Sequence, residues 1–110
     1  MIKVTIFYPI KKGDWFDVSY YLEKHMPLSK SIFADVLKGI AIEENIVDLG
    51  VNEEVISYQI IGHLFFERVE DFYTSFLPNK EILFEDALQY TNVSAILQIS
   101  KVLICQTPWI

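Results

Sequence analysis

The chain has 110 residues, of which 52% are hydrophobic, and its formal net charge is −6. This length suits one domain with a real core, so we expect residues 1–110 to form a single domain. A surface for nucleic-acid phosphates needs clustered Lys and Arg, which a chain with 9 basic and 15 acidic residues does not provide. No apolar run approaches the roughly 20 residues of a membrane helix, and a single cysteine allows no internal disulfide, so we expect a cytoplasmic protein.

The first part of the chain is predicted to form a strand and then a helix. Residues 1–8 alternate between apolar and mixed positions, as a strand with one buried face does. A helix is expected over about residues 17–34, with the Asp17 carboxylate as its cap. Because Pro27 has no N–H and its ring crowds the carbonyl four residues earlier, this helix should bend or break just past His25.

This helix is predicted to carry a titratable side chain on its apolar stripe. Spacings of three and four residues place six side chains on that stripe: Val18, Tyr21, Leu22, His25, Leu28 and Ile32. His25 is therefore expected to point into a core or a cavity.

The middle of the chain is predicted to form two strands. Residues 37–46 form the first, and its face of small residues indicates close approach by another element. Residues 47–54 are expected to form an exposed acidic connection. Residues 55–67 are apolar almost throughout, so they should form a central strand, whose more mixed face carries Gln59, Ile61, His63 and Phe65.

The last part is predicted to contain two short helices and a final strand. The helix over residues 69–77 is expected to end at Pro78. Asn79 is expected to cap a second helix that continues through residue 88, with Ile82, Leu83 and Ala87 facing inward. Residues 94–105 form the last strand, and the tail after them is too short for an element of its own.

The order strand, helix, strand, strand, helix, strand predicts an α+β fold of the ferredoxin-like βαββαβ type. Such a sandwich has one antiparallel sheet with both helices on the same face. The other face of the sheet would remain uncovered, although its mixed side chains do not suit full exposure to water. We therefore expect a homodimer in which a second copy covers this open sheet face.

Eight groups of residues, in this order and spacing, form a combined motif: Phe16-Asp17, Tyr20-Tyr21-Leu22, His25-Met26-Pro27-Leu28, Leu37-Lys38-Gly39, Gly62-His63-Leu64 with Phe66, Val69-Glu70-Asp71-Phe72, Tyr90-Thr91-Asn92 and Gln98-Ile99-Ser100. Over nearly its whole length the chain thereby resembles the EthD family, named for a protein of ethyl tert-butyl ether degradation. The resemblance implies pairing into a dimeric α+β barrel.

The resemblance also implies a range of activities. EthD-like proteins include cofactor-free enzymes, among them fungal dehydratases of aromatic polyketides, and the wider barrel group includes isomerases, cyclases and monooxygenases. The histidine of the family's His-Met-Pro-Leu motif falls on His25. The chain departs from the family in the acidic stretch Glu43 to Glu54, which replaces a small loop that contains proline.

His25 is the candidate catalytic residue, because an imidazole can take or give a proton at neutral pH. The alternative is a core histidine that is satisfied by a backbone carbonyl. Tyr8 and Tyr21 are candidate ligand-binding residues, since Tyr21 shares the stripe of His25 and Tyr8 ends the first strand. His63 and Gln98 are further ligand-binding candidates, with an interface hydrogen bond as the alternative for each.

No metal site and no cofactor are expected. The two histidines lie 38 positions apart without clustered acids or thiols, and no glycine-rich loop for phosphates or dinucleotides is present. We therefore expect a cofactor-independent enzyme in which His25 moves a proton on a small hydrophobic or aromatic molecule, by isomerisation, dehydration, cyclisation or oxygenation. The alternatives are a non-catalytic accessory protein that binds a hydrophobic metabolite for a degradation system, and a barrel whose interior is filled by Tyr21, His25 and Phe84.

Overall fold

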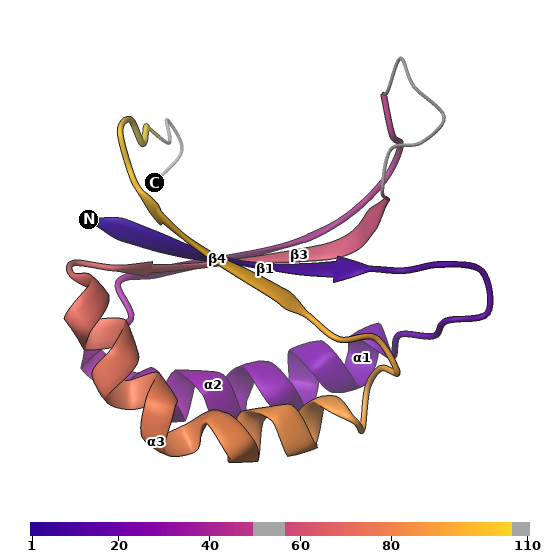
Figure 1. The fold of residues 1–110 in the computed structure, drawn as a ribbon, viewed down its shortest axis with the longest axis horizontal. Coiled ribbons are helices and arrows are strands. Elements are labelled where there is room, and N and C mark those ends of the chain that lie inside the picture. Colours follow the sequence, from indigo (N-terminus) through magenta and orange to yellow (C-terminus); the bar gives the residue numbers. More distant parts are fainter. Residues whose placement is uncertain (50–56, 107–110) are drawn as a thin grey trace.

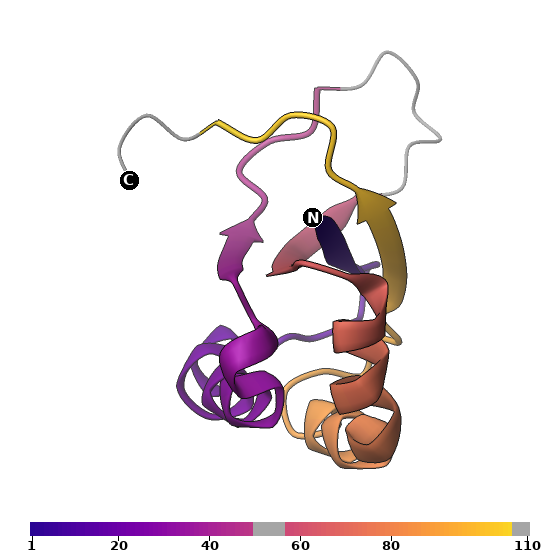
Figure 2. The ribbon, with the colours of Figure 1, turned by 90° about the vertical axis from the view of Figure 1, so that its left-hand side faces the viewer.

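The computed structural model describes residues 1–49 and 57–106, which form two layers (Figure 1). One layer is a four-stranded antiparallel sheet in the order β2-β3-β1-β4, formed by β1 (Ile2–Pro9), β2 (Gly39–Glu44), β3 (Tyr58–Phe66) and β4 (Ile96–Lys101). The other layer is helical and contains α1 (Val18–Tyr20), the π-helical turn η1 (Tyr21–His25), α2 (Met26–Phe33), the 3₁₀ turn η2 (Ala34–Val36) and α3 (Val69–Ala87). Figure 2 shows α2 and α3 on the same side of the sheet, so the predicted ferredoxin-like α+β fold is confirmed.

Three predicted features fall partly outside the described residues. These are the end of the acidic stretch at Glu53 and Glu54, the start of the third strand at Val55 and Ile56, and the tail after Gln106.

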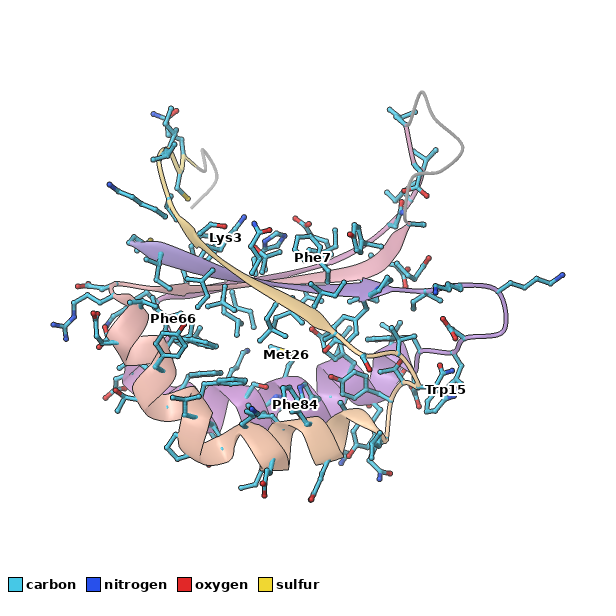
Figure 3. All side chains as sticks on the ribbon, viewed as in Figure 1. Lys3, Phe7, Trp15, Met26, Phe66 and Phe84 are labelled. Atoms are coloured by element: carbon cyan, nitrogen blue, oxygen red, sulfur yellow. The ribbon has the colours of Figure 1, made fainter. Side chains whose placement is uncertain are left out.

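The segment predicted to be a central strand lies in the middle of the sheet as β3, between β2 and β1. Its side chains alternate as the sequence predicts, with Ile60, Leu64 and Phe66 buried toward the helices. Figure 3 shows Phe66 between the sheet and the helices, whereas Lys3 and Phe7 of β1 lie on the opposite face of the sheet. The core therefore fills the space between the two layers.

The first helical region does not break at Pro27, where the sequence predicts a bend or a break. Its backbone instead forms the π-helical turn η1, in which the N–H of Met26 donates to the carbonyl of Tyr21, five residues earlier. Pro27 then lies in the first turn of α2, where its missing N–H and its fixed φ are tolerated. The helical path therefore continues past the proline.

The extra residue in η1 also changes which side chains face the core. Tyr21 and His25 are buried as predicted, but Leu22 is half exposed, because the predicted stripe has the period of a regular α-helix. The buried face of α2 consists of Met26, Ser29 and Phe33, in place of the predicted Leu28 and Ile32.

The second helical region is one helix of 19 residues, α3, and not two helices divided at Pro78. Figure 1 shows that α3 bends along its length, as a helix with an internal proline does. The side-chain amide of Asn79 donates to the carbonyl of Ser75 at 2.8 Å, so Asn79 stabilises the helix interior and does not cap a new helix. Leu83 is buried as predicted, whereas Ile82 is half exposed.

Three phenylalanines join the two layers. The ring of Phe66 on β3 lies 5.2 Å from that of Phe33 on α2 and 5.4 Å from that of Phe72 on α3, as measured between centroids. Phe66 is completely buried. Edge-to-face contacts of this kind add to the free energy gained from burial alone.

Replacing Phe66 by alanine should lower the free energy of unfolding by about 3–5 kcal/mol, because it removes a buried ring and leaves a cavity between the layers. Phe84→Ala is the matched control, since the Phe84 ring is half exposed and should cost less than half as much. Urea denaturation followed by circular dichroism measures both losses. Equal losses for the two variants would show that the Phe66 cluster does not hold the layers together.

Candidate active site

A cavity of about 410 Å³ lies between the sheet and the helices. Its floor is formed by sheet residues that include Ile6, Leu64 and Leu97, and part of its wall is formed by phenylalanine rings such as Phe72 and Phe76 of α3. Another part of the wall is polar and contains Tyr8, His25, Tyr90, Thr91 and Asn92. The interior is therefore not filled by the chain's own side chains, because His25 and Phe84 border this cavity rather than close it.

His25 is buried at the last residue of η1, and only 8% of its surface is exposed. Its imidazole stacks on the ring of Tyr21 with centroids 5.7 Å apart and planes 17° apart. The ring of Tyr90 lies on it at 4.7 Å between centroids. These two phenol rings fix the plane of the imidazole at the cavity wall.

Asp86 of α3 fixes the orientation and the tautomer of His25. Its Oδ2 atom lies 2.9 Å from Nδ1 of His25, and its Oδ1 atom accepts a hydrogen bond of 2.7 Å from the hydroxyl of Tyr20. Because a carboxylate only accepts, Nδ1 carries the proton of the histidine bond. The neutral imidazole then has its lone pair on Nε2, for which the described residues provide no hydrogen-bond partner.

Burial lowers the pKa of His25 below its ordinary value of 6.5, because desolvation disfavours the imidazolium cation. The hydrogen bond and the charge of Asp86 act in the opposite direction and raise this pKa, but by less. The imidazole is therefore neutral at pH 7. A neutral imidazole with an oriented Nε2 lone pair can act as a general base.

The hydroxyl groups of Tyr8 and Tyr90 lie 2.7 Å apart in a hydrogen bond beside His25. Burial raises the pKa of both phenols well above the ordinary value, with the Coulomb interaction between the two adding to the effect on Tyr8. Both side chains therefore keep their protons at neutral pH and act as hydrogen-bond donors.

A clamp between distant segments places Tyr90 beside the start of the first helix. The N–H of Asp17 donates to the carbonyl of Tyr90 at 2.7 Å, and the hydroxyl of Thr91 donates to the carbonyl of Trp15 at 2.8 Å. The side chain of Asn92 accepts from the N–H of Trp15 at 2.9 Å. The Tyr90-Thr91-Asn92 segment, which carries part of the EthD resemblance, therefore closes the polar part of the cavity.

The structure brings three of the five candidate residues together. Tyr8 and His25 line the cavity, and Tyr21 lies behind the imidazole. Within residues 1–49 and 57–106, the buried hydroxyl of Tyr21 has no partner at hydrogen-bonding distance. This hydroxyl packs against Gly62, where a Cβ atom would lie only 3.1 Å from the hydroxyl oxygen.

The other two candidates lie on the opposite face of the sheet. His63 and Gln98 are each paired with Thr5 of β1, one from either side, and all three point away from the helices. Nε2 of His63 lies 2.9 Å from Oε1 of Glu43 on β2. Neither His63 nor Gln98 lines the cavity, because the sheet separates them from it.

Asp86, Tyr90 and Tyr20 were missed as site residues by the sequence reasoning. Asp86 follows the buried Leu83 by three residues, and a carboxylate on an apolar helix face is a signal that could have identified it. Tyr90 belongs to the Tyr90-Thr91-Asn92 motif, which by itself assigns no role to the phenol. No pattern in the sequence pairs Tyr20 with a residue 66 positions away.

Two kinds of feature are absent from the part of the chain that the structure describes. In residues 1–49 and 57–106, no three His, Cys, Asp or Glu side chains gather to hold a metal ion. Within the same ranges, no helix is both long and apolar enough to cross a membrane.

Comparison with sequences gives no match, either to the profile of a protein family or to a curated protein. Comparison with solved structures gives several matches. The crystal structure of an EthD-like protein from Ralstonia eutropha JMP134 has a TM-score of 0.86 and 24% identity, over 96% of this chain and 95% of that chain. An ethyl tert-butyl ether degradation (EthD) family protein from Bacillus halodurans C-125 has a TM-score of 0.68 and 15% identity, over 94% of this chain and 99% of that chain.

A dimeric protein of unknown function and ferredoxin-like fold from Bacteroides fragilis NCTC 9343 is also similar, with a TM-score of 0.53. It is 13% identical, over 92% of this chain and 95% of that chain. These identities are low, so the likeness concerns the fold and not a reaction or a substrate. The resemblance read from the motifs is thereby confirmed at the level of architecture: the chain has the ferredoxin-like α+β fold of EthD-like proteins.

Proposed function

We propose that the protein is a cofactor-independent enzyme that moves a proton on a small hydrophobic or aromatic molecule bound in the cavity. The observation that carries this proposal is the hydrogen bond between Nδ1 of His25 and Asp86, at the wall of a cavity of about 410 Å³. This volume falls within the range of small-molecule sites, and the wall combines many apolar side chains with few polar groups, as such sites do.

His25 acts as the general base and Asp86 as the residue that holds it in position. When Nε2 takes a proton from the ligand, the imidazole becomes a cation whose Nδ1–H remains bonded to the Asp86 carboxylate. The partly buried ion pair stabilises the cation at the moment it forms. Tyr20 donates to the other carboxylate oxygen, so Asp86 does not turn away from the imidazole.

The reaction class that fits this arrangement is proton transfer within one substrate, as in isomerisation, dehydration or cyclisation. Each of these reactions removes a proton and returns it, or transfers it to a leaving group, and therefore needs a group that can both accept and donate. His25 meets this need because Nε2 of the neutral imidazole accepts a proton and the resulting imidazolium can donate it back.

Replacing His25 by glutamine should lower kcat/KM by about 10²–10⁴-fold, the usual contribution of a general base. The assay is a mass-spectrometric search for product across aromatic polyols, lactones and ring ketones. His63→Gln is the matched control and should keep parental activity, because His63 lies on the opposite face of the sheet. Equal turnover by His25→Gln and the parent would remove the proposal.

The pKa of His25 should lie below 6.5 in the parent and lower still in Asp86→Asn, because the carboxylate raises a pKa that burial lowers. The neutral imidazole is the active form, so the rate should fall as the pH decreases through this pKa. Nuclear magnetic resonance of the imidazole C2 proton measures the titration, and His63→Gln assigns the second signal. A parental pKa above 6.5, or no change in Asp86→Asn, would contradict this electrostatic description.

A non-catalytic accessory protein that binds a hydrophobic metabolite is the second candidate. It is favoured by the apolar part of the cavity, where the stacked rings of Phe72 and Phe76, with centroids 4.8 Å apart, offer binding but no chemistry. Saturable binding without product in the parent would support this function over the first.

We also propose a homodimer in which a second copy covers the open sheet face. In Figure 1 the segments that follow Glu44 and Lys101 rise from the sheet on the side away from the helices. These two arms carry apolar side chains that are each more than four-fifths exposed: Ile46, Leu49, Leu103 and Ile104. A partner lying on the open face would cover these side chains together with Phe7, His63 and Gln98.

Phe7→Glu should convert this dimer to a monomer, because it places a charge in the middle of the open face. Sedimentation equilibrium should give twice the chain mass of 12.8 kDa for the parent and that mass for the variant. Leu22→Glu is the control, since Leu22 is half exposed on the helical layer and should leave the dimer intact. Dissociation by Leu22→Glu alone would place the interface on the helices instead.

A further inference from the structure

The hydroxyl pair of Tyr8 and Tyr90 has a hydrogen-bonding capacity that the chain does not use. The two oxygens lie 2.7 Å apart, and one hydroxyl donates to the other. Each phenol has a single proton, so the hydroxyl that accepts keeps its own proton for another acceptor. Within the described residues, the one further group near either hydroxyl is the phenol of Tyr21, which would donate to Tyr8 and so leave the spare proton of the pair free.

Both rings belong to the cavity wall, and neither gives its proton up at neutral pH. Burial raises the pKa of both phenols, so the pair stays neutral and its free O–H remains a donor. An oxygen atom of a ligand in the cavity is the acceptor that such a donor fits. A hydroxyl that already accepts a hydrogen bond is polarised, so it is also a stronger donor.

The pair lies beside the proposed base. The ring of Tyr90 is 4.7 Å from the imidazole of His25 between centroids, and both side chains line the same cavity. A ligand oxygen held by the pair would therefore place the neighbouring carbon of the ligand near Nε2 of His25. The oxygen and the adjacent carbon are the two atoms that change when a carbonyl compound forms its enolate.

The geometry points to a site for a carbonyl oxygen at Tyr8 and Tyr90, and to ring ketones and related carbonyl compounds with a C–H group next to the carbonyl as the substrate class. This inference rests on the proposed function for its chemistry, and it adds the oxygen-binding residues and the class of substrate.

The chemical step balances without a further reactant. His25 takes the proton from the carbon next to the carbonyl, and the electron pair of the broken C–H bond forms a carbon–carbon double bond. The carbonyl electrons move to the oxygen, where the free hydroxyl of the pair stabilises the negative charge. The imidazolium then returns its proton to the same or to another carbon, which gives exchange or an isomer.

A purely structural role for the pair makes a different prediction. The bond joins the end of β1 to the loop before β4, so it also stabilises the fold. If the bond between Tyr8 and Tyr90 had only this structural role, losing it would weaken binding of a ketone and of the matching hydrocarbon equally. The ratio of the two affinities therefore separates an oxygen site from a structural contact.

The test compares 1-tetralone with tetralin, which has nearly the same shape and no oxygen, by displacement of a fluorescent apolar probe. In the double variant Tyr8→Phe with Tyr90→Phe, the affinity ratio of ketone to hydrocarbon should fall roughly three- to tenfold relative to the parent, the usual worth of one hydrogen bond. Tyr73→Phe is the matched control and should leave the ratio unchanged, because Tyr73 is a partly exposed residue of α3 outside the cavity wall. An unchanged ratio in the double variant would overturn the inference.

A second measurement needs no variant. The infrared C=O stretch of 1-tetralone bound to the parent should lie below its position in an apolar solvent, and a band at the apolar position would also overturn the inference. Neither readout depends on turnover. If His25→Gln loses turnover and the double variant keeps the parental affinity ratio, this inference alone is defeated. If His25→Gln keeps turnover and the double variant lowers the ratio, only the proposed base is defeated.

Discussion

The hydrogen bond between His25 and Asp86 is the contact on which the candidate site depends, because it joins the two helical segments above the sheet. It requires the imidazole to face α3, and the π-helical turn before Pro27 provides that direction. It also requires the carboxylate to stay in place, which the hydroxyl of Tyr20 ensures. One partly buried acid thus determines the tautomer, the orientation and part of the pKa of the only histidine on the cavity wall within the described residues.

The division of the cavity into two parts follows from the same arrangement. Phenylalanine rings near the start of α3 form an apolar part, and tyrosine hydroxyls with the imidazole form a polar part near its end. The clamp from Asp17 and Trp15 to the segment after α3 keeps the polar part closed. A ligand with an apolar body and one oxygen would therefore bind in a single orientation, which is the condition for selective proton transfer.

The sequence was sufficient for the architecture, because strand alternation and the order of elements are local signals that tertiary contacts reinforced. It also predicted the burial of His25, although the helical stripe was wrong at Leu22, since a π turn adds a residue that regular periodicity does not contain. Pro78 predicts a helix end, but packing of α3 on the core outweighs the loss of one hydrogen bond. Asp86 and Tyr90 could not be paired with His25 and Tyr8 from sequence, because these contacts join residues 61 and 82 positions apart.

The central claim is that Nε2 of His25 removes a carbon-bound proton from a molecule in the cavity. Hydrogen–deuterium exchange tests it most directly: 1-tetralone is incubated with the protein in deuterated water, and deuterium at the carbon next to the carbonyl is followed by nuclear magnetic resonance. The account predicts that the parent accelerates this exchange and that His25→Gln does not. Exchange at the same rate with the parent, with His25→Gln and without protein would contradict it.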